Sequence, residues 1–178
     1  QGNVAFRVMA KSKYDYFTDK RDGKIYKIVT IGNQVWMAQN MNYFIDDKKS
    51  CNCYDKKDLN CEIYGRLYAF KVLKDVCPDG WHVPGKEEFE TLLKNYPNAG
   101  KAYLELLSSG SSGFNSLNGG FIDDDRESGG LEDHANYWSS TAINEGTAWR
   151  LLVGGRRRNA VMDNAHQVYS YSVRCVKN

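Results

Sequence analysis

Apolar and polar positions alternate in the N-terminal quarter of the chain. In "DKRDGKIYKIVTIGNQVWMAQNMNY", residues 19–43, two alternating runs flank Gly32-Asn33, a dipeptide typical of a tight turn between strands. This pattern predicts a β-hairpin. Residues 1–18 alternate only weakly, so we expect either an added edge strand or a linker there.

The middle of the chain has the periodicity of helices. Apolar residues recur at three-residue steps in residues 64–76. In "KEEFETLLKNYP", residues 86–97, they follow the i, i+3, i+4, i+7 rule, with Glu87 and Glu88 in the first turn. We predict a helix over each segment, and one or two further helical turns over residues 101–109.

Strand patterns return in the last third. Residues 110–136 are rich in glycine and acidic residues, which predicts a mostly irregular region with one short strand. After it, "NYWSSTA", "TAWRLLVGG", "NAVMDN" and "SYSVRCVKN" each read as a strand. In the last of them the apolar positions Tyr169, Tyr171, Val173 and Cys175 alternate with Ser170, Ser172 and Arg174. We therefore expect Cys175 to share the core-facing side of this strand.

The composition is that of one globular domain. The 178 residues are 42% hydrophobic and 26% charged, with a formal net charge of +2. This balance does not favour nucleic acid as a partner, and the apolar runs are too short to cross a bilayer. The sequence begins at Gln1 without a leader, as expected for a mature or trimmed chain.

The cysteines favour an oxidising compartment. They are Cys51, Cys53, Cys61, Cys77 and Cys175, and none has the spacing of a zinc site, so the simplest count is two disulfides and one free thiol. Three of them lie in the polar loop of residues 44–65. A bond between Cys53 and Cys61 would close a short loop and contribute about 2–3 kcal/mol, which would leave Cys51 unpaired.

The order of several short motifs resembles one protein family. "IGNQVWMAQNMNY", "CPDGWHVP", "EEFETLL", "LNGGF", "YWSST" and "SVRCVKN" follow one another as in the Fibrobacter succinogenes major paralogous domain. This is a family of extracellular bacterial domains without an established activity. The resemblance covers Asp19 to Asn178, which implies an N-terminal extension or edge strand over residues 1–18 and the family domain over residues 19–178.

The resemblance implies an α+β fold. The family is similar in plan to the C-type lectin fold, with two helices packed on a mostly antiparallel sheet and a long irregular loop region. It also implies a disulfide between Cys77 and Cys175, because both positions match paired cysteines of the family. Where members usually carry a small hydroxyl residue before the second helix, this chain has Gly85, which caps a helix more weakly. The implied source is a bacterium of the Bacteroidetes or Fibrobacteres type.

Cys77 and His82 are the first candidates for chemistry, as a nucleophile and its base. Cys77 follows the end of a predicted helix, where the helix dipole opposes thiolate formation. A structural disulfide at Cys77 and a structural hydrogen bond at His82 are the better interpretation. The sequence contains none of the common hydrolase, nucleotide-binding or metalloprotease motifs, so we expect a non-enzymatic domain.

Aromatic side chains are candidates for sugar stacking. The four tryptophans are Trp36, Trp81, Trp138 and Trp149. Each lies beside apolar neighbours in a strand or turn motif, so core packing is the better interpretation. Exposed tyrosines that cluster on the surface, drawn from Tyr103, Tyr137, Tyr169 and others, are the better ligand candidates.

The acidic segment is a candidate for ligand or metal binding. It contains Asp123, Asp124, Asp125, Arg126 and Glu127 within a glycine-flanked stretch. Its carboxylates, above all Asp123, Asp125 and Glu127, are of the type that binds calcium, but their spacing is not that of an EF-hand. A solvated loop is the default interpretation.

Arg156, Arg157 and Arg158 form a basic turn between two strand patterns. Three guanidinium groups at a hairpin tip suit a carboxylate, sulfate or phosphate ligand. The alternative is a solvated turn that keeps a sheet edge from pairing with neighbours.

These observations favour a secreted or outer-surface-anchored recognition domain that binds a polysaccharide or a surface protein, with any lipid anchor upstream of the given sequence. No cofactor is expected, with calcium as the alternative. The ligand surface is expected over residues 119–136, joined by the turns at residues 144–146 and 156–159. Two other functions stay open: a structural component of a surface adhesin or filament that assembles through residues 1–18, and a glycan-active hydrolase that uses the acidic loop.

Overall fold

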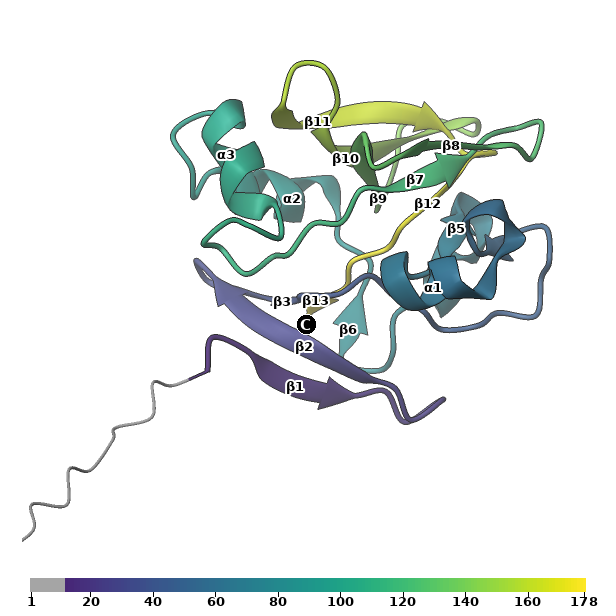
Figure 1. Cartoon of the computed structure of the whole chain (residues 1–178), viewed down its shortest axis with the longest axis horizontal. Coiled ribbons are helices and arrows are strands. Elements are labelled where there is room, and N and C mark those ends of the chain that lie inside the picture. The colour runs from purple at the N-terminus through teal and green to yellow at the C-terminus, as the bar shows by residue number, and fades with distance from the viewer. Residues whose placement is uncertain (1–11) are drawn as a thin grey trace, which may run out of the picture.

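Three sheets and several short helices form the part of the chain that the computed structural model describes, residues 12–178 (Figure 1). The strand order is β1-β2-β3-β13-β6 in the first sheet, β4-β5-β12-β7-β8 in the second and β11-β10-β9 in the third, and neighbouring strands pair antiparallel. The fold is therefore of the α+β class, as predicted. None of the helices in residues 12–178 is long and apolar enough to span a membrane.

The strands are β1 (Asp15–Thr18), β2 (Ile25–Ile31), β3 (Gln34–Met37), β4 (Cys51–Asn52), β5 (Leu67–Ala69), β6 (Trp81–His82), β7 (Gly119–Ile122), β8 (Ser128–Leu131), β9 (His134–Ala142), β10 (Thr147–Gly154), β11 (Asn159–His166), β12 (Ser170–Tyr171) and β13 (Val176–Lys177). The α-helices are α1 (Asp58–Tyr64), α2 (Lys86–Leu93) and α3 (Ala99–Leu106). Two 3-10 helices, η1 (Tyr54–Lys56) and η2 (Phe70–Asp75), complete the described elements.

β2 and β3 form the predicted hairpin. Ile31 pairs with Gln34, which leaves Gly32 and Asn33 as a two-residue turn. Gly32 has a φ of 60°, a conformation that glycine adopts without steric strain. β1 pairs with the outer side of β2 and forms the edge of the first sheet. The rest of the expected N-terminal extension, residues 1–11, lies outside the described residues.

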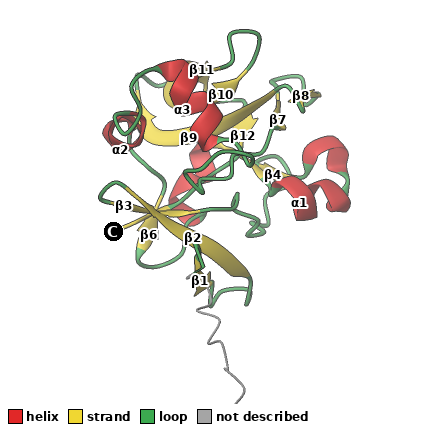
Figure 2. Cartoon of the chain, turned by 60° about the vertical axis from the view of Figure 1, so that its left-hand side comes forward, coloured by secondary structure: helices red, strands yellow, loops and turns green. Residues whose placement is uncertain are grey.

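Large aromatic side chains fill the space between the first and third sheets. Trp36 of β3 is fully buried, and its ring centroid lies 5.4 Å from that of Phe89 in α2 and 5.7 Å from that of Phe114. Phe114 in turn meets Tyr137 of β9 edge-on at 5.6 Å. α2 and α3 pack against the third sheet beside this cluster (Figure 2). Burying such rings provides most of the favourable free energy of folding in this region.

The C-terminal segment passes between the sheets and is buried on both sides. Figure 1 shows it in yellow, running from β12 in the second sheet to β13 in the first. On the way, Ser172 O accepts a hydrogen bond from Trp138 N at 3.1 Å. The alternation of apolar and polar residues predicted one buried and one exposed face for this strand. In the structure both faces are buried, because Ser170, Ser172 and Arg174 are as buried as the apolar residues between them. Cys175 does face the core, as predicted.

Arg174 lies fully buried between the first and third sheets. Its guanidinium donates hydrogen bonds to Met37 O at 3.2 Å, to Phe114 O and to Asn40 Oδ1. The group also lies 4.5 Å from the ring centroid of Phe114 and 5.2 Å from that of Tyr137. Within residues 12–178 it has no carboxylate in ion-pair range. Burial lowers the pKa of Arg174 from its usual value, and neutral oxygens and ring faces take the place of a counter-ion.

The helix predicted over residues 64–76 is wrong. The first part of this segment, Leu67–Ala69, is the strand β5, and the second part, Phe70–Asp75, is the 3-10 helix η2. All three residues of β5 are buried because β4 and β12 flank it on both edges and other elements cover its faces. A short apolar run of this kind does not distinguish a buried strand from a helix.

The polar loop of residues 44–65 contains a helix that the pattern did not predict. Leu59 and Ile63 of α1 are 63% and 50% exposed, so the helix has no apolar stripe toward the core. Its one buried residue, Cys61, is bonded to Cys53, and Gly65 with a φ of 77° ends the helix. The disulfide, more than an amphipathic pattern, holds α1 in place.

β7 and β8 form a hairpin where one short strand was predicted. Their sequences contain Gly119, Gly120, Gly129 and Gly130, and glycine is depleted in strands because it has no side chain to pack. Here the backbones approach closely: a Cβ on Gly120 would lie 2.4 Å from Gly129 O. The glycines therefore permit the pairing that their propensity argues against.

Both expected disulfide pairs are present. Cys53–Cys61 closes a short loop with a sequence separation of 8, and Cys77–Cys175 links the corner before β6 to the C-terminal segment with a separation of 98. Cys51 is free and buried, and burial raises the pKa of its thiol.

His82, the Glu88 carboxylate and the Thr141 hydroxyl hold the start of α2 in place. His82 Nε2 lies 2.8 Å from the carboxylate of Glu88, which also accepts a hydrogen bond from Gly85 N at 2.8 Å. Thr141 Oγ1, from β9, accepts one from Lys86 N at 2.9 Å. A distant threonine and a residue within the helix thus supply the caps that Gly85 cannot. The structural hydrogen bond predicted for His82 is present.

Replacing Arg174 with methionine tests the role of the buried guanidinium. The Arg174→Met variant keeps a long side chain but removes the donor from three buried oxygens on two segments of the chain, so we expect the free energy of unfolding to fall by about 3 kcal/mol. Urea unfolding followed by near-UV circular dichroism measures this loss. Arg157→Met, at an exposed turn, is the matched control and should change stability by less than about 0.5 kcal/mol. Equal unfolding midpoints for the two variants would contradict the interpretation.

Removing each disulfide separately should give losses in a fixed order. On the chain-entropy model, the longer loop closed by Cys77–Cys175 gives a contribution of about 4–5 kcal/mol, against about 2–3 kcal/mol for Cys53–Cys61. The variants are Cys77→Ser with Cys175→Ser, and Cys53→Ser with Cys61→Ser, compared by urea unfolding. A larger loss from the short loop would show that the bonds act mainly through native contacts.

Candidate functional site

The residues predicted to bind a ligand do not form one surface. Residues 123–127 are the tip of the β7–β8 hairpin. The arginine turn, residues 156–158, lies beyond the other end of that hairpin, where Gly155 N donates to Asp133 O at 3.2 Å. Tyr137 belongs to neither, because its side chain is fully buried and its hydroxyl lies 3.0 Å from Ser116 Oγ. The expectation of an exposed Tyr137 is corrected, since β9 directs it into the aromatic core.

The hairpin tip is held by its own hydrogen bonds. Asp123 Oδ1 accepts a hydrogen bond from Glu127 N at 2.8 Å, so this carboxylate is engaged within the turn. Asp124, Asp125 and Glu127 are exposed. Within residues 12–178, no three His, Cys, Asp or Glu side chains are grouped as the ligands of a metal ion would be. The acidic tip therefore acts in this structure as a solvated turn.

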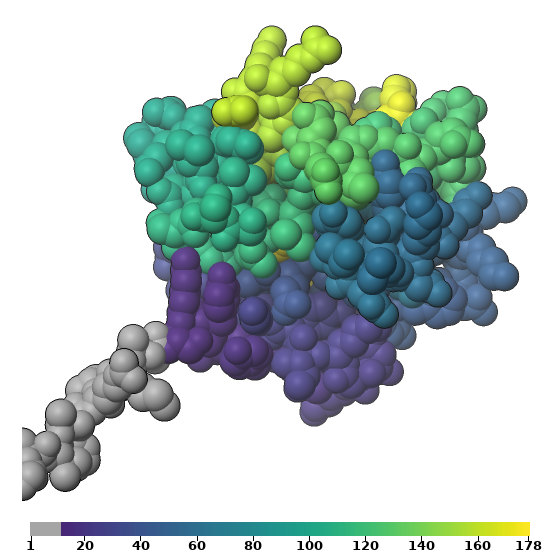
Figure 3. All heavy atoms as spheres, viewed as in Figure 1, coloured from purple at the N-terminus to yellow at the C-terminus, as the bar shows by residue number. Residues whose placement is uncertain are grey.

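A cleft of about 320 Å³ lies between this tip and the segment that precedes α1. Figure 3 shows the two surfaces meeting, the segment in blue and the hairpin in light green. The lining residues are Asn52, Asp55, Lys56, Lys57, Ile122, Arg126, Glu127 and Ser128. Arg126 and Glu127 belong to the predicted site, whereas the residues from the blue segment do not.

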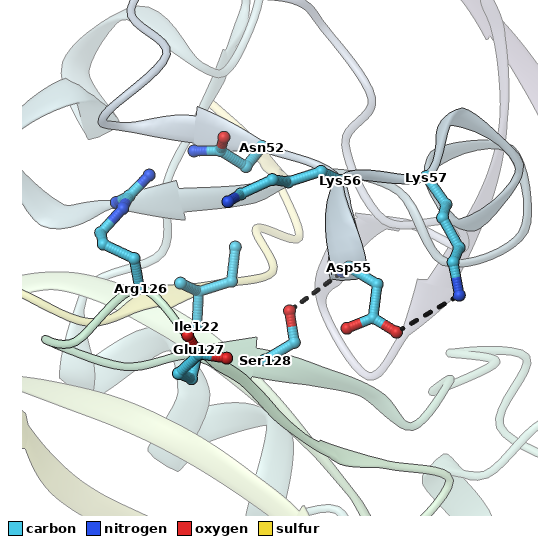
Figure 4. A pocket seen from close by; sticks show the side chains of 8 residues that line it. All are labelled: Asn52, Asp55, Lys56, Lys57, Ile122, Arg126, Glu127 and Ser128. Atoms are coloured by element: carbon cyan, nitrogen blue, oxygen red, sulfur yellow. Dashed lines mark hydrogen bonds and ion pairs between the residues drawn. The ribbon is translucent and has the colours of Figure 1, made fainter.

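Three polar side chains point into the same space. Figure 4 shows the Lys56 ammonium, the Arg126 guanidinium and the Asn52 amide converging above Ile122. Lys57 points away and pairs with Asp55 at 3.6 Å. Neither Lys56 nor Arg126 forms an ion pair with any carboxylate in the described part of the chain. Their positive charges are therefore available to a ligand.

The cleft also has unused hydrogen-bonding capacity. Asn52 Nδ2 is buried and has no acceptor among residues 12–178. The Arg126 guanidinium donates to the backbone oxygens of Lys48 and Lys49, which uses two of its five N–H groups. A buried donor without a partner is unfavourable, so a ligand acceptor at this place would be stabilised.

The backbone around the cleft is strained. Asp55, Lys56 and Arg126 have φ values of 53°, 55° and 69°, and they are three of the six described non-glycine residues with positive φ. Each such residue costs about 1–2 kcal/mol, which surrounding contacts must offset. One of these contacts is the hydrogen bond from Asp55 N to Ser128 Oγ at 2.9 Å, which joins the two walls of the cleft.

The loop that holds Arg126 is itself anchored. Hydrogen bonds from the Lys71 ammonium, the Ser50 hydroxyl and the Lys49 amide lower the pKa of Asp47 to about 2. Asp47 is therefore ionised at neutral pH and fixes the turn whose carbonyls receive Arg126. The Cys53–Cys61 disulfide fixes the opposite wall.

The arginine turn offers a different kind of surface. Arg156, Arg157 and Arg158 are all exposed and line no part of the cleft. Arg158 has a φ of 46°, so this turn too contains a strained residue. The turn keeps three solvated guanidinium groups at the end of the third sheet.

Most of the chain matches the model of a known protein family. The model of the Fibrobacter succinogenes major domain matches residues 29–177, most of the chain. The chain belongs to the Fibrobacter succinogenes major domain family. No curated protein was found to match it. No solved structure was found to match it either.

In this Fibrobacter succinogenes major domain, sequence reasoning missed one wall of the cleft. Asn52 and Lys56 lie in the polar loop that was interpreted only as a disulfide-closed segment. The sequence held only a weak signal for a tight turn at this place. Asp55 in "YDKKD" follows Cys53 closely, and Asp and Asn tolerate a positive φ better than most other residues. Only the fold brings this segment to the β7–β8 hairpin, about 70 residues away in sequence.

Two adjacent lysines provide a test of the strain at the cleft. Lys56 has a φ of 55°, so we expect Lys56→Gly to raise the free energy of unfolding by about 1 kcal/mol. Lys57 has a φ of −101°, so Lys57→Gly should lower it by about 0.5–1 kcal/mol. Urea unfolding of both variants measures the difference. Equal shifts would argue that the left-handed backbone at Lys56 stores no strain.

Proposed function

We propose that this family member is an extracellular, non-enzymatic recognition domain that binds a polysaccharide in the cleft between residues 52–57 and the β7–β8 hairpin. The observation that carries the proposal is the convergence of Lys56, Arg126 and Asn52, with free charge and free hydrogen-bond donors, on one small cleft. Strained backbone is retained at two of these three residues, as is common where function opposes stability.

The size and lining of the cleft favour a sugar over a protein partner. A volume of about 320 Å³ is at the lower end of small-ligand sites, whereas a stable protein partner needs an interface several times wider than this cleft. The lining is almost entirely polar and contains both donors and acceptors, which suits the paired hydroxyls of a sugar ring. A fixed amide and a fixed guanidinium are planar groups that engage two such hydroxyls at once.

An extracellular setting is supported by the disulfides. Two disulfides in a chain of 178 residues are typical of an oxidising compartment. Attachment to the outer surface through an upstream lipid anchor, and a role in adhesion, are part of the same proposal.

The proposal extends to the C-type-lectin-like plan. Two helices packed on antiparallel strands, and a C-terminal strand inserted between β3 and β6, are consistent with that plan.

A glycan array with the purified domain, followed by calorimetric titration of the best ligand, tests the proposal. The double variant Lys56→Gly with Arg126→Gly removes two charged donors and relieves two positive-φ residues, so the fold should persist. Each lost charge-assisted hydrogen bond is worth about 1.5–3 kcal/mol, so affinity should fall at least about tenfold.

The matched control is Arg158→Gly, which removes the same type of side chain from a positive-φ position outside the cleft. Its affinity should equal that of the unmodified domain. If Arg158→Gly loses binding while the double variant keeps it, the binding site is at the arginine turn and not in the cleft. A blank array with folded protein would remove the proposal.

A further inference from the structure

A second group of partly exposed side chains lies on the opposite face of β7. Successive residues of a strand point to opposite faces, so Phe121 points away from the cleft that Ile122 lines. The Phe121 ring stacks on His134 at 5.8 Å with an interplanar angle of 21°, and the Tyr169 ring lies 6.2 Å away. All three side chains are partly exposed, and Val168 beside them is 60% exposed. Aromatic surface is therefore open to solvent on this face.

Two glycines support these rings. A Cβ on Gly129 would lie 2.9 Å from Phe121 Cζ, and one on Gly130 would lie 2.7 Å from His134 Cε1. The rings therefore rest directly on the backbone of β8, which holds their planes in a fixed orientation. This contact also explains why β8 consists largely of glycine at this point.

A charged pair adjoins the rings. Arg150 of β10 and Asp163 of β11 are directly opposite each other and form an ion pair of 2.8 Å, with side chains 17% and 41% exposed. Arg150 also donates to Tyr171 Oη at 2.9 Å and to Asn136 Oδ1 at 2.7 Å. The ring of Tyr171 lies 6.3 Å from that of Phe121, so the ion pair and the aromatic group are continuous.

This network has donors that no described residue uses. Arg150 Nε and Asn136 Nδ2 are buried and have no acceptor within residues 12–178. Both belong to side chains that already hold each other, so their positions are fixed. Neither nitrogen reaches the surface, so a ligand with several hydroxyl groups would meet this network at the Asp163 carboxylate and at the partly exposed Arg150 guanidinium.

We propose that these residues form a second binding site, the aromatic face, which takes a pyranose ring of a neutral oligosaccharide. The aromatic face comprises Phe121, His134, Tyr169, Arg150 and Asp163. The apolar C–H side of the sugar stacks on Phe121 and Tyr169, while its hydroxyls bond to the Asp163 carboxylate and the Arg150 guanidinium. The site is separate from the cleft because the two lie on opposite faces of the same hairpin.

Titrations of the whole domain with cellohexaose, xylohexaose and mannohexaose, followed by calorimetry and amide NMR shifts, test this site. At least one probe should bind and shift the amides of β7 and β12. Phe121→Ala and Tyr169→Ala should each lower the affinity about tenfold, because each removes one stacking surface. Tyr169→Phe keeps the ring and should retain affinity within about twofold. Circular dichroism of each variant confirms that the fold is kept.

The cleft variant serves as the cross-control. Lys56→Gly with Arg126→Gly should bind the neutral probe that the unmodified domain binds, with unchanged affinity. The aromatic face is ruled out if no probe binds at millimolar concentration, if Phe121→Ala and Tyr169→Ala bind as well as the unmodified domain, or if the cleft variant alone loses binding. A glycan array without any binding that depends on the cleft, together with weaker binding of the neutral probes by Phe121→Ala and Tyr169→Ala, is a separate outcome. That result would contradict the cleft proposal and support the aromatic face.

Discussion

The buried guanidinium of Arg174 is the interaction on which the arrangement of the sheets depends. A charge in a core is tolerated only when its hydrogen bonds are satisfied. Here the acceptors come from two separate parts of the chain, the end of β3 with Met37 and Asn40, and the loop at Phe114. The rings of Phe114 and Tyr137, which meet each other edge-on, both lie beside the guanidinium and add favourable electrostatics. One side chain of the last segment thus joins the end of β3 to the loop at Phe114 and packs against Tyr137 of β9 in the third sheet.

This central segment also positions the surfaces that face solvent. β12 precedes Arg174 in the chain and pairs with β7, which carries the cleft on one face and the aromatic face on the other. β7 itself is mostly buried: Gly119, Gly120 and Ile122 are inside and only Phe121 is partly exposed, so neighbouring segments provide most of the exposed groups at both places. The hairpin is tied to the 52–57 segment by the hydrogen bond that the Asp55 backbone N–H donates to the Ser128 hydroxyl.

Sequence patterns predicted the elements that have one face toward the core and the other toward solvent. The β2–β3 hairpin and α2 are of this kind, and both are confirmed. The patterns failed where the environment depends on distant partners. β5 is buried on both faces, α1 is held by a disulfide, and the glycine strands β7 and β8 pair because their backbones approach closely. Of the eight residues that line the cleft, two, Arg126 and Glu127, came from the acidic segment, but Asn52 and Lys56 could not be placed opposite Arg126 without the fold.

The Cys77–Cys175 bond also determines how the domain would respond to a mechanical pull. Cys175 directly precedes β13, so tension that enters the domain after this strand can peel off β13 and then meets a covalent stop. Tension applied at the N-terminal end meets no disulfide until Cys53, so the edge strand β1 and then β2 and β3 would separate first. More of the chain can therefore separate from the N-terminal side than from the side of β13 before a disulfide carries the load. The cleft and the aromatic face are both built from residues that follow β3, so they should stay folded longer.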